Sequence, residues 1–501
     1  MKIELITDSI LNESRLALLE DDELAEIYIE RADNKRIVGN IYNGRVANIL
    51  PGMDAAFIDV GLDKNAFLHA GDILADQSDF EFTGERPPAE IQPNIKHILK
   101  QGQYLMVQVL KDPTGTKGAK VTTHITLPGR MTVLMPTVNY IGVSRRIEGE
   151  EERSRLKDIM ERIKPPGMGI IVRTVAEGKQ EQDFIEETQA LCRLWESIHR
   201  SWSQKKKPAL VHSEGDMLYC AIRDLFTNEV DSFVVHKDHY DDVFELTNML
   251  APHLTDKIAL YDGDSPFEAY GIEHKIERAL RRRVWLKSGG FLIFDTTEAL
   301  TVVDVNTGKF VGHSNLKNTI LQTNVEAAKE IARQLRLRHV SGIIIIDFID
   351  MEDEESKETV VDTLSEALKR DRIKSNVLGM TGLGLVELTR KKSRQRLSSV
   401  MQLTCPLCSG AGVIYSPQTV ALNLARNVLF LLKNSSVDAV IVNVHPSVAR
   451  YIGERSKKQS FFGDLSGKRI YIRANHRIHQ ERFEMEAYNL PSDADGCDIY
   501  G

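Results

Sequence analysis

The sequence predicts a multidomain α/β protein, and three observations favour this class. The chain has 501 residues, 42% of them hydrophobic and 27% charged, which is typical of a soluble globular enzyme. By a rough prior of ~150 residues per domain it holds about three to four domains, which excludes a small disulfide-bonded fold. Strand-like and helix-like runs alternate over residues 222–400, and short strands broken by Asn-Gly and Pro-Gly turns follow Gly39.

The net charge and the cysteine content exclude several other kinds of protein. The 64 basic and 72 acidic side chains give a net charge of −8, which argues against a protein that coats nucleic acid as a histone does. No apolar run approaches the ~18–20 residues of a membrane span, and the N-terminus lacks the pattern of a secretion signal. The 5 cysteines are too few for a secreted disulfide framework. We therefore expect a cytoplasmic protein with no membrane span.

Local basic clusters are candidates for phosphate binding despite the negative net charge, because phosphate contacts depend on local clustering. The clusters lie at 205–207, 278–283 and 390–396. For each cluster the alternative is a solvated helix face. The net charge therefore does not exclude a nucleic-acid site.

The first half of the chain divides into three segments. Residues 1–38 alternate in short apolar and polar runs, which predicts a strand meander that opens a larger domain. Residues 39–125 are typical of a small antiparallel barrel, with a polar, Pro-containing insert at about 75–98. Residues 126–221 combine strand-like runs with helical stretches, which predicts a compact α/β module.

The second half continues the α/β pattern. In residues 222–400 apolar strands alternate with helices expected at about 316–338 and 353–371, so we predict a mixed-sheet α/β core. A Cys-x-x-Cys segment at 401–413 follows. Residues 414–501 are expected to form a last, small α/β unit.

Two strand ends carry the side chains best suited to catalysis. Four isoleucines lead into Asp347, and a carboxylate there is costly to desolvate without a cation, a set of donors or an open sheet rim. In LTVVDVNTG, Asp304 and Asn306 are two residues apart on a strand and therefore point to the same face. The alternatives are a solvent-facing or helix-capping Asp347, and an Asn-Thr-Gly turn that closes a hairpin but leaves Asp304 unexplained.

Together these three side chains form an oxygen-rich site suited to Mg²⁺, which is usually held by one or two carboxylates plus substrate phosphate. Such a site favours phosphodiester hydrolysis, because Mg²⁺ activates water and offsets charge on the phosphoryl group. The chain has no GxxxxGK[ST], HExxH or GxSxG segment and no GxGxxG that opens a βαβ unit. Its 14 histidines are scattered singly, which disfavours a paired-histidine nuclease.

Two further motifs suit RNA. Phe57 and Phe67, in FIDVGLDKNAFLH, place aromatic rings on the barrel, where they can stack unpaired bases; the alternative is core packing. Arg173 and Thr174, in GIIVRTVAEGK, put a guanidinium and a hydroxyl at a strand end, which suits a terminal phosphate. The alternative for Arg173 is an ordinary surface salt bridge, and the two arginines of SRRIEG have the same ambiguity.

The segment TCPLCSGAG contains Cys405 and Cys408 followed by glycines, as in a zinc knuckle. Structural zinc normally takes four protein ligands, and the chain has no second Cys-x-x-Cys. Another copy of the chain is the candidate source of the missing pair. A redox Cys-x-x-Cys and a metal-free turn are the two alternatives.

The barrel and the other motifs together resemble a known family. The ordered barrel residues that resemble an S1 RNA-binding domain, an OB-type barrel, are Gly44, Val46, Gly52, Phe57, Asp59, Gly61 and Phe67. With TVVDVNTG, IIIIDFIDM, VRT and CPLCSGAG in this order, the chain resembles the bacterial ribonuclease E/G family over essentially its whole length. Because the chain stops soon after the catalytic region, without the long C-terminal scaffold tail of ribonuclease E, we expect its build to be closer to that of ribonuclease G.

The resemblance implies a fold for each segment. Residues 1–38 with 222–283 would form an RNase H-like subdomain, into which an S1 RNA-binding domain and a 5′-sensor module are inserted. The S1 RNA-binding domain would be residues 39–125 and the 5′-sensor module residues 126–221. The DNase I-like catalytic subdomain would be residues 284–400. The zinc-link would be residues 401–413, and the small C-terminal α/β domain residues 414–501.

The resemblance also implies an activity. Such enzymes are Mg²⁺-dependent endoribonucleases that cut single-stranded RNA, favour 5′-monophosphorylated ends, leave 5′-phosphate products, process rRNA precursors and act in mRNA decay. Carried onto this sequence, the metal-binding aspartates are Asp304 and Asp347, and the catalytic asparagine is Asn306. The implied zinc ligands, Cys405 and Cys408, would be shared between two chains of a homodimer, which in turn can pair into a homotetramer.

The resemblance assigns RNA contacts as well. The implied 5′-phosphate-binding residues and S1 contacts are Arg173, Thr174, Val133, Gly129, Phe57, Phe67 and Lys117. One basic residue of the family that contacts RNA near the active site has no unambiguous counterpart here. Arg372 and Lys374 are the two candidates for its place, and the sequence does not decide between them.

Two functions of other classes remain open on the sequence alone. A non-catalytic RNA-binding or ribosome-assembly factor would keep the barrel aromatics and the basic clusters, but would not need Asp304, Asn306 and Asp347 together. A zinc-dependent hydrolase would need an open zinc position with His or carboxylate ligands. The cysteine pair resembles instead half of a closed structural site.

Overall fold

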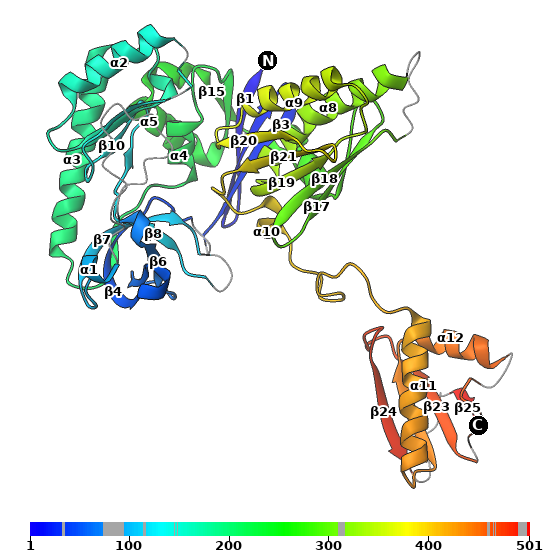
Figure 1. The fold of residues 1–501 in the computed structure, drawn as a ribbon. Helices are drawn as coiled ribbons and strands as arrows, with labels where there is room; N and C mark the ends of the chain where they lie inside the picture. Colours follow the sequence, from blue (N-terminus) through cyan, green and yellow to red (C-terminus); the bar gives the residue numbers. More distant parts are fainter. Residues whose placement is uncertain are drawn as a thin grey trace. The chain divides into compact units, whose positions relative to one another are not determined.

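The structure is a computed structural model, and the residues it describes are 1–32, 36–73, 95–113, 117–144, 146–147, 149–308, 316–457, 461–463, 465, 467–488 and 498–500. The chain folds into two compact units, residues 1–400 and 401–501 (Figure 1). No helix among the described residues is long and apolar enough to cross a membrane.

The first unit opens with a sheet of β1 (Ile3–Ile10), β2 (Glu13–Glu20), β3 (Glu23–Arg31), β14 (Ser232–His236) and β15 (Ile258–Tyr261). The strand order is β15-β14-β1-β2-β3, and β1 to β3 form the antiparallel meander that the sequence predicts. β14 pairs in parallel with β1, which brings distant parts of the chain into one sheet. Four helices lie before, between and after β14 and β15 in the chain: α4 (Met217–Asp224), α5 (Tyr240–Leu250), α6 (Pro266–Ala269) and α7 (Ile272–Leu280).

A closed five-stranded barrel of the OB type follows, as the sequence predicts. Its strands are β4 (Ile41–Leu50), β5 (Ala55–Asp59), β6 (Ala66–His69), β7 (Tyr104–Lys111) and β8 (Lys120–Thr122). The order β4-β5-β6-β8-β7 closes because β7 also pairs with β4, and β13 (Ala209–His212) extends β4 on the outside. Short α1 (Ile95–Ile98) adds Ile95 to the barrel core. Most of the predicted polar insert lies outside the described residues.

The next module is a small sheet with two helices. Its strands are β9 (Leu127–Pro128), β10 (Thr132–Met135), β11 (Ile141–Val143) and β12 (Gly169–Val172), in the order β11-β12-β10-β9. α2 (Glu150–Ile163) and α3 (Glu181–Gln204) share one core with this sheet. α3 begins with a capping box between Gln180 and Asp183, and its buried residues include Phe184, Leu191 and Ile198.

A second mixed sheet, here called the acidic sheet, is built from β16 (Arg283–Trp285), β17 (Phe291–Thr296), β18 (Leu300–Asn306), β19 (Gly342–Asp347), β20 (Ser375–Met380) and β21 (Leu385–Arg390). Its order is β16-β17-β18-β19-β21-β20, and β18 and β19 are parallel. α8 (Leu316–Leu337) and α9 (Glu354–Leu368) lie side by side against one face (Figure 1). Both predicted helices of this region are confirmed. Short α10 (Leu397–Met401) ends the unit.

Buried ion pairs join the two mixed sheets of the first unit. Arg336 of α8 forms ion pairs with Glu26 on β3 at 2.9 Å and with Glu20 on β2 at 2.7 Å. Burial alone would raise the pKa of Glu26, but the positive charges of Arg336 and Arg372 outweigh it and lower that pKa to about 2. Glu26 therefore stays ionised and holds α8, and with it the acidic sheet, against the opening meander.

The second unit is a smaller α/β domain. Its elements are α11 (Pro417–Asn434), β22 (Ala439–Val444), α12 (Pro446–Ser456), β23 (Arg469–Ala474), β24 (Phe483–Tyr488) and β25 (Asp498–Tyr500). The sheet order is β24-β22-β23-β25, with β22 parallel to β23. Every residue of β22 is buried, and all of them except Asn443 are apolar, as expected for a strand covered on both faces.

Candidate active site and anion pocket

Two carboxylates meet at the ends of the parallel strands β18 and β19. Asp304 and Asp347 are register partners, so the pairing brings them to the same edge of the acidic sheet. The preceding register partners, Val303 and Ile346, point into the core beneath α8 and α9. Because side chains alternate along a strand, both aspartates point to the opposite, open face.

The electrostatics of this acidic pair suit a cation. Burial and the negative charges of Asp304 and Asp350 raise the pKa of Asp347 above its ordinary value. Among the described residues, neither Asp304 nor Asp347 forms an ion pair, and no cluster of three or more His, Cys, Asp or Glu side chains with metal-binding geometry occurs. The available donors are thus two carboxylates and an amide, which fits Mg²⁺ completed by water and substrate oxygens.

Asn306 orients one of these carboxylates. Its Nδ2 donates to Oδ2 of Asp304 at 2.8 Å, and the alternating burial of β18 places both on the open face. The turn that follows requires glycine, because Gly308 has φ +62° and a Cβ there would lie 2.4 Å from the carbonyl oxygen of Gly289. Among the described residues, the next element after this turn is α8, and β18 pairs with β17 and β19, so no described strand supports the hairpin alternative.

A second candidate site, here called the anion pocket, is a cavity of about 1360 Å³ in the first unit. Its lining includes nine Lys or Arg and five Asp or Glu side chains. Arg173 and Thr174, directly after β12, line it together with Val133 of β10. The lining does not include the acidic pair or Asn306, so the two sites are distinct.

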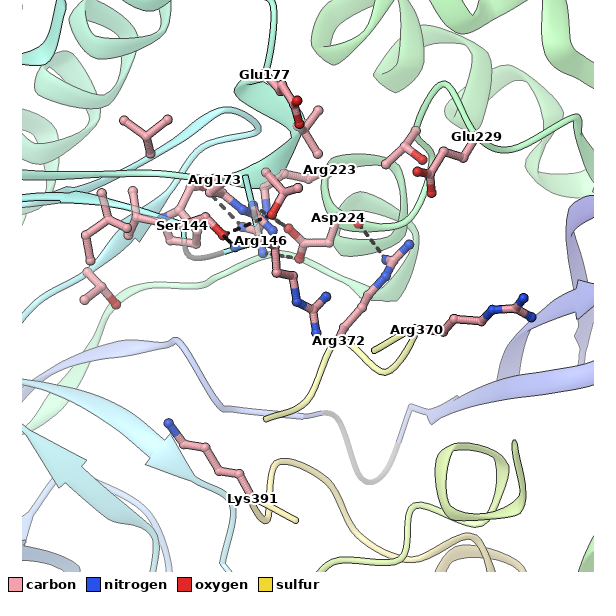
Figure 2. A pocket seen from close by; sticks show the side chains of 18 of the residues that line it. Ser144, Arg146, Arg173, Glu177, Arg223, Asp224, Glu229, Arg370, Arg372 and Lys391 are labelled. Carbon is pink, nitrogen blue, oxygen red and sulfur yellow. Dashed lines mark hydrogen bonds and ion pairs between the residues drawn. The ribbon is translucent and has the colours of Figure 1, made fainter. Parts of the chain in front are cut away.

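Asp224, at the end of α4, gathers the arginines of this pocket (Figure 2). Its carboxylate forms ion pairs with Arg173 at 2.7 Å and with Arg223 at 2.8 Å. Its backbone carbonyl accepts a hydrogen bond from Arg372 at 2.7 Å. Burial would raise the pKa of Asp224, but the hydrogen bond from Arg223 and the charge of Arg173 lower it. Arg173 thus forms the ion pair that the salt-bridge alternative expects, within a cavity lined by several other cations.

Hydroxyl groups complete the pocket. Thr174 Oγ1 and Ser144 Oγ lie 3.1 Å apart, beside the cationic side chains. Arg146 also lines the cavity and donates to the backbone carbonyl of Asp371. Arg145, its neighbour in SRRIEG, lies outside the described residues. Guanidinium groups and hydroxyl donors are the groups that bind a phosphate, so the pocket can hold a phosphorylated end.

Gly129 acts on the pocket through its backbone. Its carbonyl accepts from Arg173 Nη1 at 2.7 Å, which fixes the guanidinium. The adjacent amides of Arg130 and Thr132 donate to the Glu187 carboxylate at 2.6 and 2.8 Å. A Cβ at Gly129 would lie 2.7 Å from the carboxyl carbon of Glu187, so this close approach requires glycine.

The two barrel phenylalanines face outward. Phe57 and Phe67 are register partners on β5 and β6, with ring centroids 6.2 Å apart in an edge-to-face arrangement. Their neighbours Ile58 and Leu68 are fully buried in the barrel core, so the half-buried rings lie on its outer face. Lys117 is exposed and shortly precedes β8, the strand that pairs with β6 beside Phe67.

The cysteine pair lies at the start of the second unit. Cys405 and Cys408 are free thiols, and the amide of Gly412 donates to Cys408 Sγ at 3.4 Å. Backbone hydrogen bonds from Cys408 and Leu407 lower the pKa of Cys405. Hydrogen bonds from backbone amides to a sulfur stabilise the thiolate, which is the form that binds zinc. Two thiolates make only half of a structural zinc site, and Cys497 lies outside the described residues.

Several pocket residues have no signal in the sequence. Asp224 reaches Arg173, and Ser144 reaches Thr174, through tertiary contacts between separate elements, while Arg223 pairs with Asp224. Nothing in the local pattern of these residues distinguishes them from surface polar residues. Arg372, a candidate for RNA contact near the active site, lies in the anion pocket. Lys374 does not line that pocket. The one local clue, Arg223 next to Asp224 at a helix end, is too common to predict a site.

Fold and sites define a class: a multidomain α/β protein with an OB-type barrel, an acidic cation-type site at a sheet edge and a separate pocket for anions. The chain matches the Ribonuclease E/G family over residues 126–393 and the RNase E/G thioredoxin-like domain over residues 404–488. The chain belongs to the ribonuclease E/G family, whose members are endoribonucleases, that is, hydrolases that cleave RNA.

Individual relatives agree with this assignment. Ribonuclease G of Haemophilus influenzae is 42% identical over 492 residues, which cover 96% of this chain and 99% of that protein. Ribonuclease G of Escherichia coli K12 is 42% identical over 491 residues, covering 97% and 99%. Ribonuclease E of a Nostoc species is 38% identical over 408 residues, which cover 79% of this chain and 57% of that protein.

The sequence alone predicts a small α/β domain for the second unit and does not indicate its thioredoxin-like class. The resemblance to thioredoxin does not extend to the placement of the cysteines. Cys405 and Cys408 precede α11, which begins only at Pro417, and no strand of the unit precedes them. A redox Cys-x-x-Cys typically sits in a strand-to-helix turn, so this arrangement disfavours the redox alternative.

Proposed function

We propose that this chain is a Mg²⁺-dependent endoribonuclease that hydrolyses single-stranded RNA and leaves 5′-phosphate products. The observation that carries the proposal is the register pairing of Asp304 with Asp347 on the open face of the acidic sheet. Membership of the ribonuclease E/G family supports RNA as the substrate. A non-catalytic RNA-binding protein would have no use for two adjacent carboxylates when burial and the charge of its neighbour raise the pKa of Asp347.

Three residues of the acidic sheet would have different roles at the scissile bond. Asp304 and Asp347 would hold Mg²⁺, which when bound polarises the phosphoryl oxygens and lowers the pKa of a water. Asn306 donates to one oxygen of Asp304 and so fixes that carboxylate toward the open face. The side-chain oxygen of Asn306 remains an acceptor on the same face, in a position to orient a water or a ribose hydroxyl.

The barrel and the anion pocket bind the substrate away from the cleaved bond. Phe57 and Phe67 offer rings for base stacking, which is sequence-tolerant and selects unpaired RNA. Lys117 adds a positive charge on the same barrel. In the pocket, Arg173 and Thr174 bind a terminal phosphate, so RNA with a 5′-monophosphate is favoured over RNA without one.

The cellular roles that we infer rest on the family resemblance: processing of rRNA precursors and decay of mRNA in the cytoplasm. We also infer a homodimer in which Cys405 and Cys408 of each chain share one structural zinc ion. The amide hydrogen bonds to both sulfurs support this inference, because they favour thiolates in a preformed half-site. A two-fold axis supplies the second pair of thiolates, and two such dimers can associate into a tetramer.

We expect Asp304→Asn or Asp347→Asn to lower kcat for a short single-stranded RNA by more than ~10²-fold, because the cation loses a charged ligand. Affinity for the same RNA in EDTA should change little, since the barrel is untouched. Asp295→Asn is the matched control: this half-exposed carboxylate of β17 pairs with Arg282, and its loss should leave kcat within about threefold. Normal turnover by either acidic-pair variant would contradict the active-site assignment.

We expect Arg173→Gln to reduce the preference for 5′-monophosphorylated over 5′-hydroxyl RNA by about 10- to 100-fold, the scale of a charge-assisted hydrogen bond. The rate on 5′-hydroxyl RNA should be spared, because that substrate leaves the pocket empty. The measurement is kcat/KM on one oligonucleotide with either end. Arg162→Gln, which removes an exposed arginine of the same module, should retain the preference. Equal slowing of both substrates by Arg173→Gln would assign the arginine to general RNA binding or to folding.

We expect native mass spectrometry to find one zinc ion per dimer, or half an ion per chain. A Cys405→Ser, Cys408→Ser double variant should lose the zinc and shift toward monomer, because the shared ligands are gone. Cys192→Ala, a cysteine of the first unit, should retain both zinc and dimer. One zinc bound to an isolated monomer, or a zinc-free dimer of normal stability, would exclude the shared site.

A further inference from the structure

An exposed aromatic group lies at the edge of the acidic sheet, and neither the core nor the proposed sites account for it. Trp285, on the edge strand β16, is 56% exposed. Phe291 on β17 contacts it edge-to-face, with ring centroids 5.3 Å apart. The guanidinium of Arg283 lies 4.5 Å from the centre of the Phe291 ring and 5.6 Å from that of Trp285. We call these three residues the β16 patch.

The β16 patch shares the open face with the acidic pair. On β16 and β17 the alternating residues Val284 and Leu292 point into the core beneath α8 and α9. Trp285 and Phe291 therefore point to the opposite side, which is the side that Asp304 occupies on β18. The face opposite the two helices thus carries the acidic pair near its middle and an aromatic, cationic group toward one edge.

The strand register places the patch directly beside the acidic pair. Trp285 pairs with Phe291, and Phe291 pairs with Asn306, so these three residues form one row across the sheet. The next row runs from Arg283 through Ile293 to Asp304. With neighbouring strands about 4.8 Å apart, the backbone of Trp285 is about 10 Å from that of Asn306. A nucleotide bound at the acidic pair would therefore have its neighbour over the patch.

The composition of the patch fits a nucleotide. An exposed indole offers a flat apolar surface for stacking, and base–aromatic stacking does not depend on base identity. Arg283 forms no ion pair with any described residue, so its charge is available to a backbone phosphate. Packing does not explain Trp285, because Val284 and Leu286 on either side of it already fill the core with less than a tenth of their surface exposed.

We propose that the β16 patch is a substrate subsite: a base of the single-stranded RNA next to the scissile bond stacks on Trp285, and an adjacent phosphate pairs with Arg283. The proposal rests on the proposed function, since the same RNA is cleaved at the acidic pair. The patch positions the strand and takes no part in the chemical step. It would add a binding contact close to the cleaved bond, separate from the barrel and from the anion pocket.

The test is a double-mutant cycle between protein and RNA. The substrate is a short 5′-hydroxyl RNA, which removes the contribution of the anion pocket, and a series of copies each lacks one base near the cleaved bond. We expect Trp285→Ala to lower kcat/KM on the intact RNA by about five- to thirtyfold, the scale of one stacked base. For the wild-type protein, removing one particular base, and no other, should lower kcat/KM by the same factor. For Trp285→Ala, removing that base should lower kcat/KM no further.

Two control variants separate stacking from folding. Trp285→Phe keeps a stacking ring and should retain most of kcat/KM. Phe244→Ala removes an exposed aromatic ring on α5 and should remain within about twofold of the wild type. Unchanged kcat/KM for Trp285→Ala, or independent losses at every abasic position, would overturn the subsite. A shift in oligomeric mass for Trp285→Ala would also overturn it, because the patch would then be covered by a second copy of the chain.

A binding measurement separates this proposal from the proposed function. In full-length protein carrying Asp347→Asn, RNA should quench a component of tryptophan fluorescence that is absent after Trp285→Phe is added. Quenching without cleavage by the wild type would retain the subsite and overturn the proposed function. Cleavage by the wild type with no quenching from Trp285 would retain the function and overturn the subsite.

Discussion

The parallel register between β18 and β19 is the constraint on which the candidate active site depends. It places Asp304 beside Asp347 because Val303 and Ile346 interlock with the core under α8 and α9. A slip of one residue would turn one aspartate into that core and one apolar residue onto the open face. The cost of burying an unpaired carboxylate makes such a slip improbable, so the apolar face of the sheet specifies the spacing of its polar face.

The same sheet is tied to the anion pocket through one short segment between α9 and β20. Asp371 forms an ion pair with Arg390 of β21 at 2.6 Å, and both side chains are almost fully buried. The backbone carbonyl of Asp371 accepts from Arg146, and the next residue, Arg372, donates to Asp224. The pocket that we assign to the 5′ end and the sheet that we assign to cleavage are therefore in direct hydrogen-bonded contact. This contact gives a physical basis for one RNA to be held at both sites.

Sequence reasoning succeeded where the signal is local. Alternation along LTVVDVNTG predicts that Asp304 and Asn306 share a face, and the helices at about 316–338 and 353–371 match α8 and α9 to within a few residues. Turn residues and short strands predict the barrel. In each case the pattern follows from a strand or helix period within one segment.

Sequence reasoning failed where the contact is long-range. Asp224 reaches Arg173, and Arg372 reaches Asp224, from separate elements, so no periodicity records either contact. The sequence does not distinguish Trp285 as a surface residue, because a lone tryptophan in RRRVWLK is equally typical of a buried strand. Its exposure and its row with Asn306 appear only once the register is known.

In the proposed reaction the acidic pair directs water onto the phosphodiester bond. The most direct measurement is cleavage of a defined single-stranded RNA in H₂¹⁸O with Mg²⁺, followed by mass spectrometry of both products. We expect one ¹⁸O atom in a 5′-phosphate on the downstream product and an unlabelled 3′-hydroxyl on the upstream product. An upstream 2′,3′-cyclic phosphate and a downstream 5′-hydroxyl, both unlabelled, would contradict it, because the ribose and not water would then be the nucleophile.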